Sequence, residues 1–249
     1  MASERQLLEE KSPWWGEHLH RYEAALPWIG NGAKVLDLAC GTGFGSHLLA
    51  QHTSGNVVGG DIAPDIIEQC RRQWQCPNLS FEVLDGTALP YSNGYFNALV
   101  SFETIEHTRD YRQMLAEFRR VLRHGGNAII STPNFIINSP SGKVTNPFHT
   151  QEFVYDELYQ LLREVFAQVR IFGQQYIRYT QKKGLKWAIA QATEALLYQR
   201  GVRKMPIEWQ DQIMQTLIKK PQYPLADDYI LTEQPSELMQ CKTFFAICS

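Results

Sequence analysis

The stretch Lys34-Val35-Leu36-Asp37-Leu38-Ala39-Cys40-Gly41-Thr42-Gly43-Phe44-Gly45 decides the fold of this chain. An apolar strand that contains one acid, Asp37, runs into a turn with three glycines at alternate positions. Glycine permits tight turns and close ligand approach, and a helix starting there directs backbone N–H groups at the ligand. Eighteen residues after Gly43, a second apolar stretch ends in Asp61, an acid placed to accept both hydroxyls of a ribose. The pattern predicts a site for an adenosine-containing cofactor.

Strand-like and helix-like segments alternate from residue 34 to about residue 132. We expect strands at 35–39, 57–61, 79–84, 97–102 and 128–131. We expect helices at 46–51, 64–74 and 111–122, the last with apolar residues at helical spacing. This alternation predicts an α/β fold with a parallel sheet covered on both faces.

The pattern changes after residue 133. A loop rich in Pro, Asn, Ser and Gly is followed by a helix at 155–166, a strand at 169–172 and helices at 182–199 and 207–218. A last strand at 242–247 is expected to insert back into the sheet. We therefore expect one domain over 1–249, with a helical cap (1–30), a cofactor-binding core (31–173), a helical insertion or lid over the substrate (174–240) and a final strand (241–249).

The segment before the first strand has an amphipathic stripe. Its members are Trp14, Trp15, His18, Leu19, Tyr22, Ala25 and Leu26. Either this helix caps the sheet, or Arg21 and Tyr22 close over the cofactor as well.

Composition narrows the class of protein. The net charge of −2 provides no general basic field that would draw the chain to nucleic acid or to a membrane. The five cysteines are scattered and read as reduced thiols. The charged start contains no signal peptide, and no apolar run reaches the ~20 residues of a membrane span. We expect a cytoplasmic protein without nucleic-acid or membrane partners; the sequence does not indicate an oligomeric state.

Three features, two acids and one polar run, distinguish between cofactors. Asp37, just before the turn, would repel a pyrophosphate but attract a sulfonium cofactor with a cationic amino group. Asp85 follows the third strand and is suited to accept from an adenine amino group. Glu103 belongs to the polar run 102–107 after the fourth strand, where a parallel sheet places its active site.

The succession of these segments resembles the class I S-adenosylmethionine-dependent methyltransferases. The matching segments are VLDLACGTGFG (35–45), VVGGDIAPD (57–65), FEVLDGTALPYSNGYFNALVSFETIEH (81–107) and VLRHGGNAIISTPN (121–134). The resemblance covers 35–172 and the last strand. It implies a Rossmann-like, seven-stranded, mostly parallel sheet with an antiparallel last strand, and S-adenosyl-L-methionine as the cofactor.

The resemblance also implies roles for individual residues. Around the cofactor it places Asp37, Gly41 and Gly43 at the methionine part, Asp61 at the ribose, Ile62 on the adenine, Asp85 and Gly86 at the adenine edge, and Phe102 or Glu103 beneath the sulfonium. Structural alternatives are open at two of these positions. Asp61 could cap the helix that begins at Pro64, and Asp85 could simply form an Asp-Gly turn.

Two histidines are candidate catalytic bases. Methyl transfer to a hydroxyl requires alignment and removal of a proton, and histidine titrates near neutrality. His107 follows the fourth strand, and His149 lies in a later loop. The alternatives are that His107 only bonds a loop carbonyl and that His149 only caps the next helix.

Glu103, Glu106, His107 and His149 also form a candidate metal site. Two carboxylates and two imidazoles suit a divalent cation, Mg or Mn, with open positions. This set resembles the metal site of small-RNA 3′-terminal 2′-O-methyltransferases. Such a metal could bind vicinal hydroxyls and lower the pKa of one of them.

The acceptor is less well defined by the sequence. We favour O-methylation of a sugar, glycan or other small hydroxylated acceptor, because the layout resembles bacterial methyltransferases of glycans and quinone-type molecules. The alternatives are a metal-dependent RNA 2′-O-methyltransferase and a non-catalytic protein that binds S-adenosylmethionine. N- or C-methylation stays open.

Overall fold

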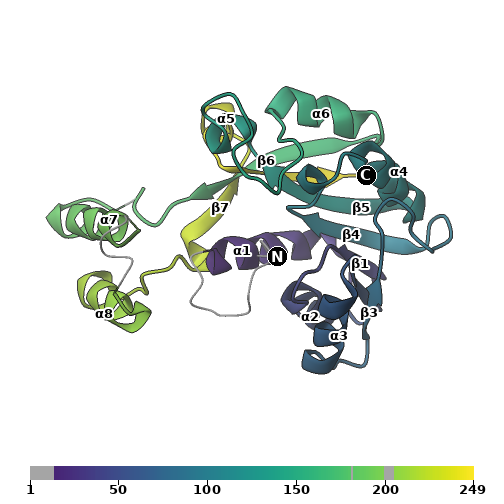
Figure 1. Cartoon of the computed structure of the whole chain (residues 1–249), viewed down its shortest axis with the longest axis horizontal. Helices are drawn as coiled ribbons and strands as arrows, with labels where there is room; N and C mark the ends of the chain where they lie inside the picture. Colours follow the sequence, from purple (N-terminus) through teal and green to yellow (C-terminus); the bar gives the residue numbers. More distant parts are fainter. Residues whose placement is uncertain (1–13, 181, 199–204) are drawn as a thin grey trace. The chain divides into compact units, whose positions relative to one another are not determined.

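A single mixed sheet organises the protein (Figure 1). The computed structural model describes residues 14–180, 182–198 and 205–249. The strands are β1 (Val35–Leu38), β2 (Val57–Asp61), β3 (Leu79–Val83), β4 (Phe96–Phe102), β5 (Leu122–Pro133), β6 (Val169–Tyr176), β7 (Tyr229–Thr232) and β8 (Thr243–Cys248). The α-helices are α1 (Trp15–Ala25), α2 (Phe44–His52), α3 (Pro64–Gln73), α4 (Tyr111–Val121), α5 (Phe135–Asn138), α6 (Tyr155–Arg163), α7 (Leu185–Tyr198), α8 (Ile207–Ile218) and α9 (Pro235–Leu238).

The strand order is β3-β2-β1-β4-β5-β8-β6-β7. The first five of these strands in space run parallel, and β8 pairs antiparallel with both β5 and β6. The predicted α/β fold, with its mostly parallel sheet, N-terminal helix and antiparallel last strand, is therefore confirmed.

The described residues contain one strand more than the seven expected. It is β7, a short edge strand inside the region expected to be purely helical. Its sequence, Tyr-Ile-Leu-Thr, has the β-branched and aromatic residues that favour strands. At four residues, it is too short to give a clear period-2 pattern in the sequence.

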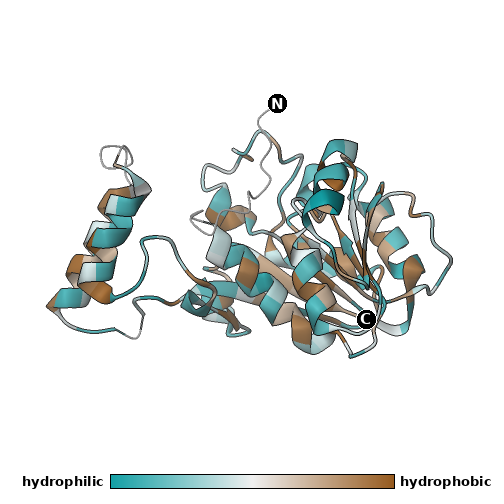
Figure 2. Cartoon of the chain, turned by 90° about the horizontal axis from the view of Figure 1, so that it is seen from below, coloured by the Kyte–Doolittle hydropathy of each residue, from teal (hydrophilic) through white to brown (hydrophobic). Residues whose placement is uncertain are grey.

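The two faces of the sheet are covered by different helices. Leu36 and Leu38 of β1 share a buried cluster with Leu115 of α4 and Leu161 of α6. Asp37, between them, points to the opposite face, as the alternation of a strand requires, where it meets side chains of α1 and α2. The helices around the sheet are amphipathic, with hydrophilic and hydrophobic residues on the same helix (Figure 2).

The described chain forms two compact units. One contains Arg21–Gln175 and Leu231–Ser249, and the other contains residues 14–20 and Tyr176–Ile230. The second unit corresponds to most of the predicted insertion, whereas residues 231–240 belong with the sheet. The role of this unit as a lid stays a prediction.

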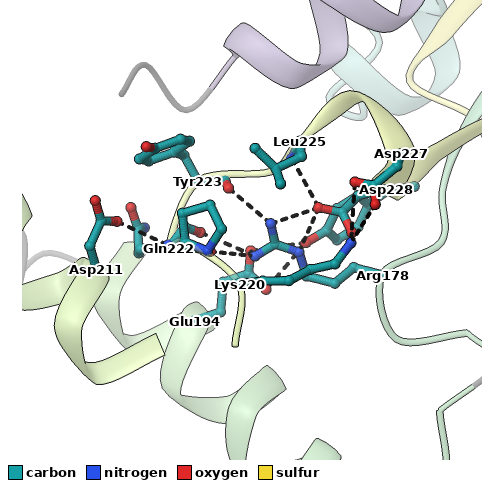
Figure 3. Close-up of polar contacts among 11 residues, drawn as sticks. Arg178, Glu194, Asp211, Lys220, Gln222, Tyr223, Leu225, Asp227 and Asp228 are labelled. Atoms are coloured by element: carbon teal, nitrogen blue, oxygen red, sulfur yellow. Dashed lines mark hydrogen bonds and ion pairs between the residues drawn. The ribbon is translucent and has the colours of Figure 1, made fainter. Parts of the chain in front are cut away.

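The second unit has its own core. Helices α7 and α8 pack through Ala190, Leu197, Met214 and Ile218. A buried polar network adds to this core (Figure 3).

The centre of that network is Arg178. Its guanidinium donates to Asp228 Oδ2 at 2.7 and 2.9 Å and to the carbonyl of Tyr223 at 2.9 Å. Glu194 of α7 lies 3.5 Å away. Because buried charges must be paired, this network fixes the loop between α8 and β7.

Among the described residues, no helix is long and apolar enough to cross a membrane.

Candidate functional site

The glycine turn joins β1 to α2 across residues 39–43. Gly41 and Gly43 have φ values of 53° and 78°, in the left-handed region where glycine is strongly favoured. A Cβ on Gly43 would also lie 2.9 Å from Cys70 Sγ and from the Phe81 ring. Ala39 has φ 60° as well, a conformation that costs energy for a residue with a Cβ. The turn is thus held in a strained shape at the end of β1.

The third glycine of the run serves packing. Gly45 lies in the first turn of α2, and a Cβ there would be 1.9 Å from the Tyr22 ring. Helices α1 and α2 therefore approach closely at this point. Tyr22 packs between the two helices in this way, and its hydroxyl reaches Asp37 of β1.

Asp37 is a buried acid beneath the turn. Its carboxyl accepts hydrogen bonds from Ser46 Oγ at 2.6 Å and from the Tyr22 hydroxyl at 3.2 Å. Burial raises the pKa of Asp37 to about 7, although the Ser46 and Tyr22 hydrogen bonds act in the opposite direction. A cation placed beside it would favour the charged form. Its predicted attraction for the amino group of a cofactor is compatible with this environment.

Asp61 ties the end of β2 to the glycine turn. Its Oδ2 accepts from the backbone N–H of Gly41 at 3.2 Å, and its Oδ1 accepts from that of Ala63 at 3.0 Å. The bond from Ala63 lies at the start of α3, so the alternative that Asp61 caps this helix is realised in part. A carboxylate has about four acceptor sites, so these two bonds do not exclude a ribose at Asp61. Ribose binding stays a prediction. The next residue, Ile62, is 67% exposed, as an adenine-packing side chain would be in the absence of cofactor.

Asp85 and Gly86 follow β3. Asp85 Oδ1 accepts from the Thr87 N–H at 2.8 Å and from its hydroxyl at 2.7 Å, and these bonds lower the pKa of Asp85. The Asp-Gly turn alternative is therefore realised for one of its oxygens. Gly86 is required by packing, because a Cβ would lie 2.8 Å from Leu38 and 2.9 Å from Met114.

Arg21 and Tyr22 attach α1 to the sheet. Arg21 is buried and donates to Gln174 Oε1 at 2.8 Å and to Thr243 Oγ1 at 3.4 Å. Tyr22 stacks edge-on against Phe102 of β4, with ring centroids 4.9 Å apart. These contacts agree with the capping alternative. A role of either residue in closing over the cofactor stays a prediction.

Glu103 marks the end of β4. It is a non-glycine residue with φ 50°, and such strain concentrates at functional sites. Its carboxylate accepts from Ser131 Oγ at 2.7 Å and lies 3.7 Å from Arg21. Phe102 and Glu103 thus lie beside the end of β1, because β1 and β4 are paired neighbours.

A second group of side chains, here called the histidine cluster, consists of Glu106, His107 and His149. One ligand atom from each lies within 4.8 Å of the others. The two imidazole rings meet edge to face, with centroids 4.9 Å apart. Glu106 and His107 come from the short 3₁₀ turn Ile105–His107 after β4.

Hydrogen bonds across the fold bring His149 to this turn. The backbone N–H and hydroxyl of Thr150 donate to the carbonyl of Glu106 at 2.7 and 3.0 Å. The amide of Gln151 donates to the carbonyls of Ile105 and Thr108 at 2.7 and 2.9 Å. The loop that carries His149 is thereby fastened to the end of β4.

The carboxylate of Glu152, which was not predicted from the sequence, positions His149. The Nδ1 of His149 lies 2.7 Å from Glu152 Oε1, so this nitrogen carries the proton. The other Glu152 oxygen accepts from Ser139 Oγ at 2.8 Å, and both carboxylate and imidazole are buried. His149 therefore does not act as a helix cap. The His-x-x-Glu spacing was the available signal.

Glu106 is the buried acid of the cluster. Its Oε2 accepts from Thr132 Oγ1 at 2.9 Å, and its Oε1 has no hydrogen-bond partner within the described residues. Burial raises the pKa of Glu106 well above its ordinary value, and the nearby charge of Glu103 adds to this rise. An unpaired buried carboxylate oxygen is costly, and a cation beside it would relieve that cost.

His107 is more accessible than His149. Its side chain is 35% exposed, and its Nδ1 donates to the Phe148 carbonyl at 3.0 Å. The loop-carbonyl alternative is thus realised, and it leaves Nε2 as the basic nitrogen, 3.9 Å from Glu106 Oε1. The structure brings three of the four predicted metal ligands together. The fourth, Glu103, lies outside this group, since its carboxylate accepts from Ser131 Oγ and lies 3.7 Å from Arg21; its role as a ligand stays a prediction.

Known proteins resemble this chain in sequence and in fold. Residues 35–126 match the family model described as a methyltransferase domain. A protein of Mycolicibacterium smegmatis, named as a probable S-adenosylmethionine-dependent methyltransferase, is 35% identical over 157 residues, which are 62% of this chain and 59% of that protein. A demethylmenaquinone methyltransferase of Thermus thermophilus is 35% identical over 100 residues, which are 39% of this chain and 46% of that protein.

The first of these relatives is substantially longer than the matched region, since the chain spans about three fifths of its length. In structure, an S-adenosylmethionine-dependent methyltransferase from Mesorhizobium loti gives a TM-score of 0.60 at 14% identity, over 96% of this chain and 98% of that chain. This similarity shows a shared fold.

Proposed function

We propose that the chain is a class I S-adenosylmethionine-dependent methyltransferase, which its similarity to a methyltransferase domain and to a probable S-adenosylmethionine-dependent methyltransferase supports, and that it transfers the methyl group of S-adenosylmethionine to a hydroxyl of a sugar or another small acceptor. The observation that carries the choice of a hydroxyl is the histidine cluster at the end of β4. It lies at the same sheet edge as the glycine turn, since β1 and β4 are parallel neighbours.

The cofactor supplies an electrophilic methyl group, and the chain supplies alignment and a base. In an in-line displacement the acceptor oxygen attacks the methyl carbon, the bond from carbon to sulfur breaks, and the hydroxyl proton must leave. His107 is the base in this proposal, because it is the exposed histidine and its Nδ1–H is already committed to Phe148. His149, buried on Glu152, holds the edge of the His107 ring.

A divalent cation is the alternative to a free base at this cluster. Glu106, His107 and His149 would hold it, and the unpartnered Oε1 of buried Glu106 fits such a ligand. The Nε2 of His107 would then bind the cation instead of taking the proton, and the Nε2 of His149 would bind it in place of the Asn146 amide that lies 2.9 Å away. A cation there would bind the acceptor hydroxyl and lower its pKa. Titration of Mn²⁺ or Mg²⁺ into the wild type and into His107→Ala tests this part. Heat in the wild type alone supports it, and equal, negligible heats in both proteins remove it.

Small acceptors are favoured over nucleic acid. The net charge of −2 gives no electrostatic attraction for a polyanion. The similar protein of Thermus thermophilus is named for a quinone-type acceptor, demethylmenaquinone. A hydroquinone, the reduced form of a quinone with two ring hydroxyls, is therefore a first probe.

The test is a screen of acceptors in which released S-adenosylhomocysteine is measured. Sugars, catechols, hydroquinones and a short RNA with a 3′-terminal diol are compared. We expect turnover with a small hydroxylated acceptor and a loss of about 10²–10⁴-fold in His107→Asn, the usual contribution of a general base. Turnover of RNA alone would replace the proposed acceptor class. Binding of S-adenosylmethionine without turnover of any acceptor would favour the non-catalytic alternative.

A further inference from the structure

One helix of the second unit exposes an apolar face. Six residues of α7 recur at helical spacing on its exposed side: Leu185, Ala188, Ile189, Ala192, Ala195 and Leu196. The three large ones are 78%, 46% and 57% exposed, in the order Leu185, Ile189 and Leu196. These six residues, the α7 stripe, form a continuous band along the helix.

The α7 stripe is distinct from the face that α7 buries. That second face contains Ala190 and Leu197, which pack on Met214 and Ile218 of α8. Helix α7 therefore has an apolar face for α8 and another that no described residue of its own unit covers. Exposed apolar bands of this kind mark interaction surfaces.

The neighbouring helix shows the contrast. The exposed residues of α8 are Glu208, Trp209, Gln212, Gln215 and Thr216. With the exception of Trp209, they are polar, as expected for a helix that faces water. The apolar exposure is thus a property of α7 and not of the whole hairpin.

The charges beside the stripe all have one sign. Lys182, Lys183 and Lys186 are exposed at the start of α7, and the ammonium groups of Lys182 and Lys186 lie 5.2 and 5.7 Å from the Trp187 ring centre. The one acid of residues 182–198, Glu194, is buried and bonded to the Tyr176 hydroxyl at 2.9 Å. Cations at the start of a helix oppose its dipole, so helix stability does not explain their position.

We propose that α7 docks on an anionic lipid surface, with the α7 stripe among the acyl chains and the three lysines at the headgroups. An apolar helix face flanked by lysines is the pattern of interfacial helices, and each lysine near an anionic membrane strengthens attachment. The attachment is peripheral, since no helix of the described residues spans a membrane. It revises the expectation of no membrane partner, which rested on the net charge of the whole chain.

The experiment is co-sedimentation of the full chain with vesicles. Wild type should bind vesicles of phosphatidylcholine mixed with phosphatidylglycerol and bind phosphatidylcholine alone more weakly. Replacing Leu185, Ile189 and Leu196 together by Gln should weaken binding by about tenfold or more. Replacing Lys182, Lys183 and Lys186 by Gln should remove the preference for the anionic vesicles, a loss of about tenfold.

Two controls make the result specific. Trp209→Gln removes a large side chain that is 63% exposed on α8, and it should change binding by less than about twofold. His107→Asn should bind vesicles like the wild type, so that a failure of docking and a failure of catalysis are separate outcomes. The replaced side chains are exposed, so far-ultraviolet circular dichroism should be unchanged.

Three results would overturn the proposal. The first is that the wild type binds neither vesicle type. The second is that the Gln-substituted stripe binds as well as the wild type. The third is a stripe-dependent dimer in sedimentation velocity without vesicle binding, which would assign the stripe to a second copy of the chain.

Discussion

The glycine turn and the histidine cluster lie at the ends of two paired strands, yet they are built differently. The turn, with Asp37 below it, forms within one continuous strand-turn-helix segment. The histidine cluster joins residues more than forty positions apart, and hydrogen bonds from Thr150 and Gln151 hold it together. The first region depends on local backbone geometry and on one buried acid. The second depends on a loop that must fold back on β4.

The largest expected effect concerns Asp37. Its carboxyl has a pKa of about 7 when folded and near 3.8 when unfolded, so the folded state binds more protons between these values. This contribution to stability is fully present below about pH 4 and is lost as the pH rises to about 7. Asp37→Asn cannot titrate at this position. The free energy of unfolding of the variant minus that of the wild type should therefore increase by about 3 kcal/mol from about pH 5 to about pH 8.

Urea unfolding of both proteins at the two pH values measures this difference. The comparison uses the change between pH values, so any constant effect of the Asn side chain cancels. Equal pH dependence of unfolding in the two proteins would mean that Asp37 is ionised in the folded protein and that the pKa of its carboxyl is not raised.

In the histidine cluster, Glu152→Ala should lower the free energy of unfolding by about 2–3 kcal/mol. It leaves the buried Nδ1–H of His149 and the hydroxyl of Ser139 without their acceptor. Chemical denaturation measures the loss. Asp156→Ala, at an exposed position of α6 in the same part of the chain, is the matched control and should cost less. Similar small losses in both variants would show that the loop does not depend on the Glu152 contact.

Asp61→Ala should weaken binding of S-adenosylmethionine by about 2 kcal/mol. The variant leaves ribose hydroxyls poorly paired and removes the acceptor of the Gly41 N–H. Isothermal titration calorimetry measures the affinity, with Asp65→Ala in the first turn of α3 as the control. An unchanged affinity in Asp61→Ala would contradict the assignment of this acid to the cofactor.

The smallest effect tests the strain in the turn. Ala39→Gly should stabilise the protein by about 0.5–1 kcal/mol, because glycine tolerates φ 60° and the gain exceeds its added entropy loss. Ala116→Gly, on the exposed face of α4, should instead destabilise by about 1 kcal/mol. Thermal unfolding distinguishes them. Destabilisation by both changes would show that the turn stores no strain at Ala39.

The contrast between the regions also explains what could be predicted. The ends of β1 and β2 could be located because Gly41, Gly43 and Asp61 belong to a short pattern set by backbone geometry. The fold followed from alternating periodicity. Strand β7 and the short helices α5 and α9 were not predicted, since segments of four residues carry little periodic signal. The lid role and the contacts with a cofactor remain predictions, because they require a bound partner.

The histidine cluster was predicted less completely. His107 and His149 were named as candidate bases and as members of a candidate metal site, and the structure does bring them together. Glu152 was missed because its role depends on a loop conformation that no local pattern specifies. Glu103 was named with the metal ligands but is held apart from them by its contacts with Ser131 and Arg21, and sequence spacing does not show such contacts.

The most direct test of the account is a calorimetric titration of S-adenosylmethionine into the wild-type protein. We predict saturable binding at one cofactor per chain, with micromolar affinity and weaker binding in Asp61→Ala. An absence of binding at micromolar protein would contradict it, since the glycine turn, Asp37 and Asp61 would then have no cofactor to hold.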